Sequence, residues 1–150
     1  MPQNCGQQQL TTNQLMTLVP YIMFNGTCEE ALNFYAGALG GQVENLMHFE
    51  GTPAEGMSAD KNKVLHAHFR AGDLFFMASD GDQNGGSISS AVHMSLDFKS
   101  AEEEQKAFDA LAEGGKVTMP LQDTFWGARF GMLTDRFGIP WMFNYDAPKA

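Results

Sequence analysis

The sequence predicts an α+β protein made of two tandem βαβββ modules that together form a concave ligand trough. Three observations lead to this prediction. Short apolar runs of strand length surround two amphipathic segments with helical periodicity. Each helical segment begins with a capping box and ends at a pair of glycines. The second half of the chain also repeats the order of the first. One such module closes no cavity by itself, so we expect a ligand site in the concave space between the two.

The first module is expected over residues 17–79. Its opening strand, 17–24, is an apolar run in which Pro20 indicates an edge or a bulge. Thr27 and Glu30 form a capping box for a helix that ends at Gly40 and Gly41. That helix is expected over 28–39, and three strands follow it, over 42–49, 64–70 and 74–78.

The second module is expected over residues 91–146, after a polar, glycine-rich linker at 79–90. Ser100 and Glu103 form its capping box, and Gly114 and Gly115 end its helix near residue 113. Its strands are expected over 91–98, 116–121, 128–134 and 139–145. Residues 15–150 therefore form one domain, preceded by a flexible arm at 1–14.

An internal duplication explains this order. Residues 24–43 align with 98–117 at a constant offset of 74, with nine identities in twenty positions and no gap. The identical pairs include Phe34 with Phe108 and both residues of each glycine pair. Amphipathic helices aligned by chance would share far fewer positions, so we interpret the two halves as copies of one unit.

Composition excludes several classes of protein. The 150 residues include nine Lys and Arg against eighteen Asp and Glu, a net charge of −9, which disfavours nucleic acid and anionic membrane surfaces as partners. No apolar run approaches the ~20 residues of a membrane helix, and the N-terminus does not resemble a signal peptide. Two cysteines without a CxxC spacing suit a reducing cytoplasm, which is the expected location. Ten Met and twelve Phe exceed what one small core readily absorbs, which favours a homodimer.

The residue pattern resembles the vicinal-oxygen-chelate superfamily, which includes glyoxalase I, extradiol dioxygenases and bleomycin- and fosfomycin-resistance proteins, and within it the PhnB-like family. The resemblance covers about residues 19–145. It is carried by PYIMFNG at 20–26, by Phe34-Tyr35 before Gly40-Gly41, and by TDRFGIPW at 134–141. Members of this family often carry the label 3-demethylubiquinone methyltransferase. The resemblance implies the two-module fold, a small-molecule ligand and, in part, the dimer.

Superfamily enzymes hold a divalent cation with His, Glu or Gln side chains from the first and last strand of each module. The resemblance maps these positions onto Val19, Phe76, His93 and Met142. Because only His93 is polar, we expect neither the superfamily metal centre nor another cofactor. His93 is then either a pocket-lining histidine or an acid or base in ligand chemistry.

His66 and His68 lie two residues apart on an expected strand, so their side chains share one face. Three interpretations stay open for this pair: a metal site completed by His48 or Glu44, a polar lining of the trough, or two half-exposed side chains. Tyr21, on the first strand, is a further expected ligand-binding residue.

Three large aromatic residues near the end of the second module, Phe125, Trp126 and Trp141, belong either to the core, to a dimer interface or to an aromatic wall of the ligand site. Trp126 is the better candidate for stacking on a ligand. Arg129 is one of three arginines and forms either an ion pair or a clamp for an anionic group. The residues expected to bind ligand are thus Tyr21, His66, His68, His93, Trp126, Arg129 and Met142.

Two functions remain open at this point. The first is a binder of an aromatic or amphipathic small molecule without a metal, and the second is an enzyme of lyase, isomerase or oxygenase type in the same trough. Methyltransferase activity is not expected, because the glycine-rich turn at 80–86 leads into a strand instead of the helix that a Rossmann-like cofactor site requires. Cys28 stands in the first turn of a helix, which lowers a thiol pKa, but Glu29 and Glu30 oppose that effect.

Overall fold

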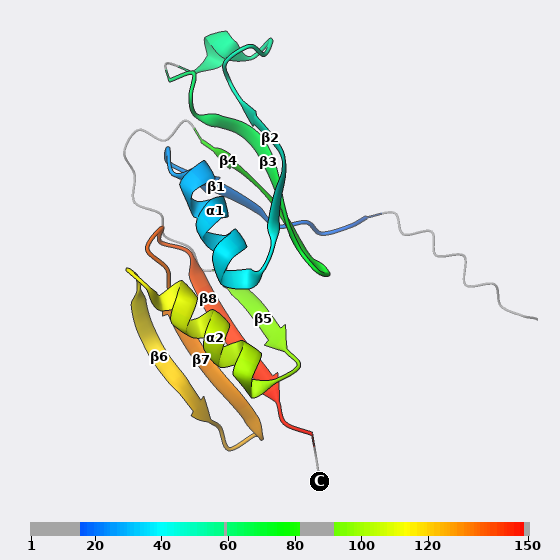
Figure 1. Cartoon of the computed structure of the whole chain (residues 1–150), viewed down its shortest axis with the longest axis vertical. Helices are drawn as coiled ribbons and strands as arrows, with labels where there is room; N and C mark the ends of the chain where they lie inside the picture. Colours follow the sequence, from blue (N-terminus) through cyan, green and yellow to red (C-terminus); the bar gives the residue numbers. More distant parts are fainter. Residues whose placement is uncertain (1–15, 59, 82–91, 149–150) are drawn as a thin grey trace, which may run out of the picture.

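Two four-stranded sheets, each covered by one helix, form the protein (Figure 1). The computed structural model describes residues 16–58, 60–81 and 92–148. Module one contains β1 (Tyr21–Phe24), α1 (Cys28–Leu39), β2 (Gln42–His48), the short 3-10 helix η1 (Glu55–Met57), β3 (Val64–Ala71) and β4 (Leu74–Asp80). Module two contains β5 (Met94–Phe98), α2 (Ala101–Ala112), β6 (Lys116–Asp123), β7 (Ala128–Thr134) and β8 (Pro140–Asp146). The predicted α+β fold with two βαβββ modules is confirmed, whereas the predicted arm at 1–14 lies outside the described residues.

Both sheets have the same topology. The strand orders are β1-β4-β3-β2 and β5-β8-β7-β6, and the first strand of each module pairs in parallel with the last. The other pairs are antiparallel. Within the described ranges the two sheets share no hydrogen-bonded strand pair, so β1 and β5 are edge strands and the structure forms no closed barrel.

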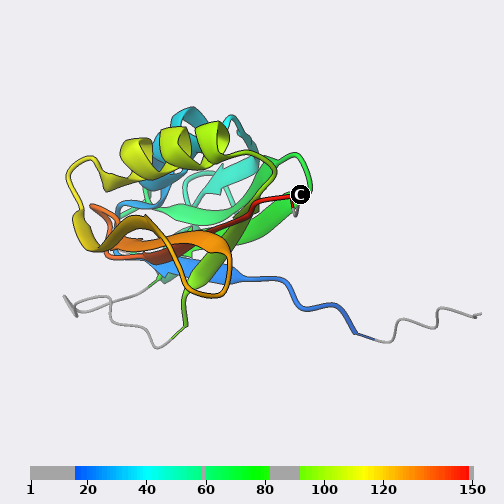
Figure 2. The same cartoon turned by 90° about the horizontal axis from the view of Figure 1, so that it is seen from below.

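The helices lie side by side on one side of the molecule, and both sheets lie beneath them (Figure 2). Each sheet therefore has a face covered by helix and a face turned away from it, which we call its open face. Side chains alternate along the strands, so the buried residues of β1, Ile22 and Phe24, alternate with the exposed Tyr21 and Met23.

The modules are held together by Tyr35, a fully buried residue of α1. Its hydroxyl donates to Asp135 Oδ2 in module two at 2.5 Å, and Trp141 Nε1 donates to the same oxygen at 2.8 Å. The amides of Phe137 and Ile139 donate to Asp135 Oδ1 at 2.8 and 3.0 Å. The buried carboxylate therefore has four donors, three from its own module and one from the other.

A second buried carboxylate organises module one. Asp80, at the end of β4, accepts from the amides of Gly26 and Cys28 through Oδ1 and from the amide of Val64 through Oδ2, at 2.9 to 3.0 Å. It thus ties the start of α1 and of β3 to β4. This corrects two expectations: β4 continues through Ser79 and Asp80, which the sequence assigned to the linker, and Thr27 makes no side-chain cap.

The other helix ends follow the sequence more closely. Ser100 Oγ accepts from the amide of Glu103 at 3.1 Å, which confirms the Ser100 side-chain cap of the second predicted capping box. Gly40 adopts the left-handed conformation (φ 69°) that ends α1. Gly41 lies so close to β3 that a Cβ there would stand 2.7 Å from the carbonyl oxygen of Arg70, so only glycine fits. β1 is shorter than predicted and begins at Tyr21.

Across the described ranges, no helix combines the length and the apolar character that crossing a bilayer demands.

Tyr35→Phe tests the bond between the modules. Burial, and after it the Asp135 carboxylate, raises the pKa of Tyr35, so the hydroxyl stays protonated and donates. Removing a buried donor to a charged acceptor is expected to lower the free energy of unfolding by about 1.5–3 kcal/mol, measured by urea denaturation. Tyr145→Phe is the matched control, since its hydroxyl makes no hydrogen bond within the described part of the chain, and it should change stability by less than about 0.5 kcal/mol. Equal effects of both substitutions would contradict the role of Tyr35.

Candidate functional site

The open face of module one brings three predicted site residues together: Tyr21, His66 and His68. Strand register places Tyr21 of β1 opposite Met77 of β4, and Met77 opposite His68 of β3. Glu44 of β2 lies opposite His68. His66 lies two residues before His68 on the same face, as the period of a strand requires. Three neighbouring strands thus bring a phenol and two imidazoles onto one surface.

A continuous chain of hydrogen bonds joins these side chains. The Tyr21 hydroxyl lies 3.1 Å from His66 Nδ1, His66 Nε2 lies 2.9 Å from His68 Nε2, and His68 Nδ1 lies 3.2 Å from Asn45 Nδ2. The two imidazole rings are almost perpendicular, with centroids 4.8 Å apart. The chain lies at the protein surface, where a bound molecule can reach it.

Apolar side chains surround this polar chain. Met23 and Met47 are exposed large hydrophobic residues on the two edge strands of the sheet, β1 and β2. Met77 lies between Tyr21 and His68. The ring of Phe75 packs edge-on against His68 at 5.4 Å. Thioether side chains adapt to the shape of a bound molecule, so this surface suits a flat apolar ligand with one polar group.

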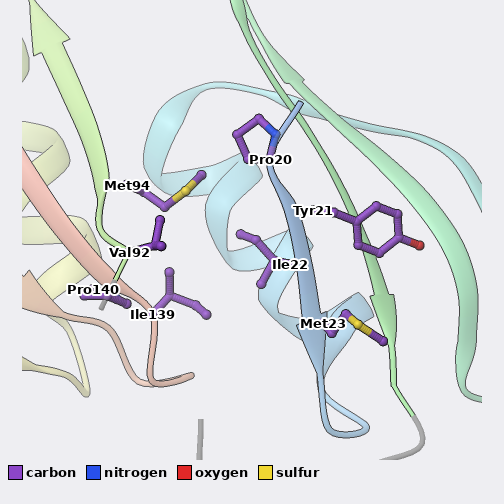
Figure 3. Close-up of a pocket in the computed structure, with 8 residues that line it drawn as sticks. All are labelled: Pro20, Tyr21, Ile22, Met23, Val92, Met94, Ile139 and Pro140. Atoms are coloured by element: carbon purple, nitrogen blue, oxygen red, sulfur yellow. The ribbon is translucent and has the colours of Figure 1, made fainter. Parts of the chain in front are cut away.

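A cavity of about 340 Å³ separates β1 from β5 at the junction of the modules. This volume is within the range of small-ligand pockets. Figure 3 shows Ile22 pointing from β1 into the cavity, toward Val92 and Ile139, while the Tyr21 ring points to the other side of β1. The lining residues are Pro20, Tyr21, Ile22, Met23, Val92, Met94, Ile139 and Pro140. Tyr21 therefore connects the cavity with the histidine pair.

The open face of module two carries different chemistry on the same backbone. By strand register, Ser95 corresponds to Tyr21, Met142 to Met77, and Met132 to His68. Among the described residues, the side-chain hydrogen bond between β5 and β8 on this face runs from Asn144 Nδ2 to Asp97 Oδ1, at 3.2 Å. The histidine pair is thus specific to module one.

This register corrects one mapped position. Phe76 was expected to face the trough, but it is fully buried on the helix side, where its ring packs against Tyr35 and Phe69. The residue of β4 that corresponds to Met142 is Met77, which is also apolar. Val19 precedes β1 and is half-buried. The mapped position therefore moves from Phe76 to Met77, and a thioether side chain there is no ligand for a hard cation.

The remaining predicted residues lie elsewhere. His93 is exposed just before β5, and Trp126 is 56% exposed in the β6–β7 hairpin beside Phe125, which is 98% exposed. Trp141 belongs to the core. The Arg129 guanidinium donates to the Ala101 carbonyl oxygen and to Gln105 on α2. Arg129 therefore points to the helix side of its sheet, away from the open face, and the ligand-binding roles of all these residues stay predictions.

Metal ligands do not converge on the histidine pair. His48 contacts Glu29 on α1 at 2.9 Å, and Glu44 lies 3.6 Å from Arg70, so neither completes a site with His66 and His68. Over residues 16–58, 60–81 and 92–148, no three His, Cys, Asp or Glu side chains form a group able to hold a metal ion. Residues of this part of the chain therefore do not fit the superfamily cation.

Cys28 is a buried free thiol. Burial, followed by the carboxylates of Asp80 and Glu29, raises the pKa of the thiol to about 12. The thiolate is the reactive form, so Cys28 is not suited to act as a nucleophile at neutral pH.

Two site residues were not expected from the sequence. Asn45 stands at an irregularity of β2 with a positive φ of 51°, between Glu44 and Met47 in the strand register. Phe75 reaches His68 only through the β3–β4 pairing. The sole sequence signal for Asn45 is its residue type, because Asn tolerates the left-handed region better than most residues.

Two βαβββ modules side by side, with helices on one side and open sheet faces on the other, form the fold class that the resemblance to vicinal-oxygen-chelate proteins predicts. FosX, a fosfomycin resistance protein from Listeria monocytogenes determined with Mn(II) and a dihydroxypropylphosphonic acid, has this fold at 12% identity (TM-score 0.58, covering 87% of this chain and 92% of that one). Within the class, the chain belongs to the family described as 3-demethylubiquinone-9 3-methyltransferase, whose model matches residues 16–143. The PhnB-like resemblance is thereby confirmed.

Two relatives are similar over most of their length. Protein YjdN from Escherichia coli (strain K12) is 34% identical over 139 residues, which cover 86% of this chain and 95% of YjdN. The crystal structure of PA1353 from Pseudomonas aeruginosa is 43% identical with a TM-score of 0.78, covering 87% of this chain and 98% of that one.

Glu104 of α2 generates a prediction on pH dependence. It is fully buried, both its carboxylate oxygens lack a hydrogen-bond partner among the described residues, and Arg129 Nε is 3.8 Å away. Burial raises the pKa of Glu104, and Arg129 opposes this shift. When folding raises the pKa of a carboxyl group, the protein loses stability as the pH rises from the ordinary pKa of that group to its raised pKa.

Glu104→Gln is therefore expected to raise the free energy of unfolding at pH 7 by about 1 kcal/mol, with a smaller gain at pH 4. Urea unfolding at the two pH values measures this difference. Glu103→Gln, an exposed change in the same helical turn, serves as control and should alter neither value. A loss of stability in Glu104→Gln at pH 7 would show that the Arg129 contact outweighs the cost of burial.

Proposed function

We propose that the protein binds a small molecule on the open face of module one and in the adjoining cavity, without a metal ion. The observation that carries this proposal is the hydrogen-bonded chain from Tyr21 to Asn45, exposed among methionines beside a cavity of about 340 Å³. Such a combination of an adaptable apolar surface and a few oriented polar groups is typical of small-ligand sites. The apolar Met77 and Met142 at the mapped ligand positions support a site that works without the superfamily cation.

An enzyme in the same place is the second candidate. It is favoured by the direct contact of the Tyr21 phenol with His66, since both groups serve as general acids and bases in other sites. The class of reaction would be proton transfer within a bound metabolite, as in a lyase or isomerase. Methyl transfer is not proposed, although the family carries that description, because among the described residues the next element after β4 is the strand β5 and not a cofactor-binding helix.

A thermal-shift screen of metabolite libraries tests the binding function. A ligand at about 100 times its Kd stabilises the native state by about 2.7 kcal/mol, which raises the melting temperature by several degrees. His66→Ala is expected to abolish the shift produced by any such ligand. His48→Ala is the matched control, because His48 contacts Glu29 of α1 and does not belong to the hydrogen-bonded series from Tyr21 to Asn45. This variant should keep the full thermal shift. A ligand whose shift survives in Tyr21→Ala, His66→Ala and His68→Ala would place the site elsewhere.

The protein purified without a polyhistidine tag is expected to contain no stoichiometric Zn, Mn or Fe, measured by mass spectrometry of the elements. Bringing a divalent cation to the apolar mapped positions would remove its water without replacing it by ligands, which is strongly unfavourable. EDTA should therefore leave the melting temperature unchanged. One equivalent of metal that disappears in His93→Ala would restore the superfamily site, and one that disappears in His66→Ala or His68→Ala would move the metal to the histidine pair.

We also propose that the chain forms a homodimer that covers exposed apolar side chains, among them Phe125 and Trp126 of the β6–β7 hairpin. Sedimentation equilibrium at micromolar concentration should give twice the chain mass of 16.5 kDa. A monomer across this range would contradict the proposal.

A further inference from the structure

The hydrogen-bonded chain on module one has a direction. A neutral imidazole carries one N–H and one bare nitrogen, so each ring can donate from one side only. Asn45 presents its amide nitrogen, which donates, to His68 Nδ1. His68 Nδ1 is therefore the bare nitrogen, and the proton of this ring is on Nε2, from where it is donated to His66 Nε2 at 2.9 Å.

The same logic fixes the next two bonds. Because His66 Nε2 accepts, its proton is on Nδ1 and is donated to the Tyr21 hydroxyl oxygen at 3.1 Å. The Tyr21 oxygen thus accepts from inside the chain, and its own proton is directed outward. Tyr21 is 44% exposed and its ring points away from the cavity (Figure 3), so this proton is accessible to a molecule bound on the open face.

The orientation of one side-chain amide decides the direction of every bond. With the Asn45 amide reversed, its oxygen would accept from His68 Nδ1, both rings would exchange their protonated nitrogen, and the Tyr21 hydroxyl would donate inward. Among the described residues the Asn45 side chain forms its hydrogen bond with His68, at the opposite end of the hydrogen-bonded series from Tyr21. It would act on a ligand through two histidines and a tyrosine, which makes it a positioning residue.

The surroundings narrow the chemistry of the acceptor. The protein carries a net charge of −9, and Glu44 lies on the same face. The cation of that face, Arg70, lies 3.6 Å from Glu44 and over the ring of Phe75 at 4.7 Å from its centroid. The described strands carry no other Lys or Arg on this face, so an anionic ligand would meet a repulsive field there. An uncharged oxygen acceptor avoids this repulsion, and Met23, Met77 and Phe75 offer contact to an apolar body.

We infer that Asn45 sets the donor-to-acceptor direction of these hydrogen bonds, so that Tyr21 donates its hydroxyl proton to a ligand oxygen. The site then takes uncharged carbonyl compounds with an apolar body. The inference rests on the proposed binding function and adds to it the class of ligand and the residue that orients the donor.

Histidine tautomers test the direction without any ligand. Long-range proton–nitrogen correlation spectra of the full chain labelled with ¹⁵N-histidine distinguish the two neutral forms, and the same nitrogen shifts verify that the rings are neutral. His48→Gln and His93→Gln assign the signals of the other two of the four histidines, and correlation of each ring with its own assigned backbone amide separates His66 from His68. We expect His66 protonated on Nδ1 and His68 on Nε2. The opposite pattern, or the same tautomer in both rings, would overturn the inference.

Asn45→Asp reverses the direction in a nearly isosteric way. An ionised carboxylate only accepts, so both rings should exchange their protonated nitrogen, while His48 and His93 keep their tautomers. Asp tolerates the positive φ of position 45 nearly as well as Asn, so the fold should be retained. Unchanged tautomers in this variant would show that Asn45 does not orient the chain.

Two aryl probes test the ligand class, with methyl spectra of ¹³C-methionine protein as readout. Acetophenone carries a carbonyl oxygen, and ethylbenzene has nearly the same shape without one. One hydrogen bond should make acetophenone bind about five-fold more tightly. This preference should disappear in Tyr21→Phe and in Asn45→Asp, whereas ethylbenzene should bind all three proteins equally.

The outcomes separate the two proposals. If ethylbenzene shifts the signals of Met23 and Met77 but acetophenone binds no more tightly, the inference on direction and ligand class fails and the binding function stands. If neither probe shifts any methionine signal at its solubility limit, and the metabolite screen also gives no ligand, the binding function fails. Tighter binding of benzoate than of acetophenone would overturn the preference for uncharged ligands.

Discussion

The architecture depends on a buried carboxylate in the β7–β8 turn. Asp135 is withdrawn from water, so its charge is tolerated only because four donors surround it. Three of these donors come from its own turn and from β8, and they shape the turn. The fourth, the Tyr35 hydroxyl, comes from the helix of the other module. Any sliding of one module against the other would remove one of the four donors of the carboxylate and leave the buried Tyr35 hydroxyl without its partner, so this bond fixes how the modules sit.

The position of the cavity follows from that bond. Tyr35 also contacts Phe137 and Trp141 of module two, so an aromatic layer fills the space beneath the helices. With the helices in contact there, β1 and β5 face each other as unpaired edges, and the cavity opens between them. Tyr21 stands on one of these edges. The Tyr35–Asp135 bond thus determines where Tyr21 lies, although Tyr35 is on the helix side of the sheet and the Tyr21 side chain is on its open face.

Local signals in the sequence predicted most of the fold, and long-range contacts account for the failures. Gly40 and Ser100 act through neighbouring residues, and both behave as predicted. Thr27 does not cap α1, because Asp80 of β4 supplies the acceptor from 52 residues away. The mapped position Phe76 was wrong by one residue, since mapping by sequence resemblance ignores strand register and a shift of one residue moves a side chain to the other face.

The site was predicted in part for the same reason. Strand period alone placed His66 and His68 on one face, and Tyr21 joined them as expected of a first-strand residue. That the two rings meet nitrogen to nitrogen depends on rotamers and on Asn45, whose place at an irregularity of β2 has no sequence signature. The internal duplication also gives no indication of the site. The two modules share one backbone arrangement, but Ser95 and Met132 of module two occupy the positions of Tyr21 and His68.

The topology of each module has a consequence for the order in which the chain acquires its structure. All four strands of module one lie within residues 21–80, so its sheet can form on a ribosome before module two has been synthesised. Asp135, however, follows Tyr35 by 100 residues. During that interval the part of α1 that packs on Phe137 and Trp141 faces water, and the Tyr35 hydroxyl has only water as a partner. A nascent chain therefore carries a nearly complete module with an apolar flank, which only its own second half is shaped to cover.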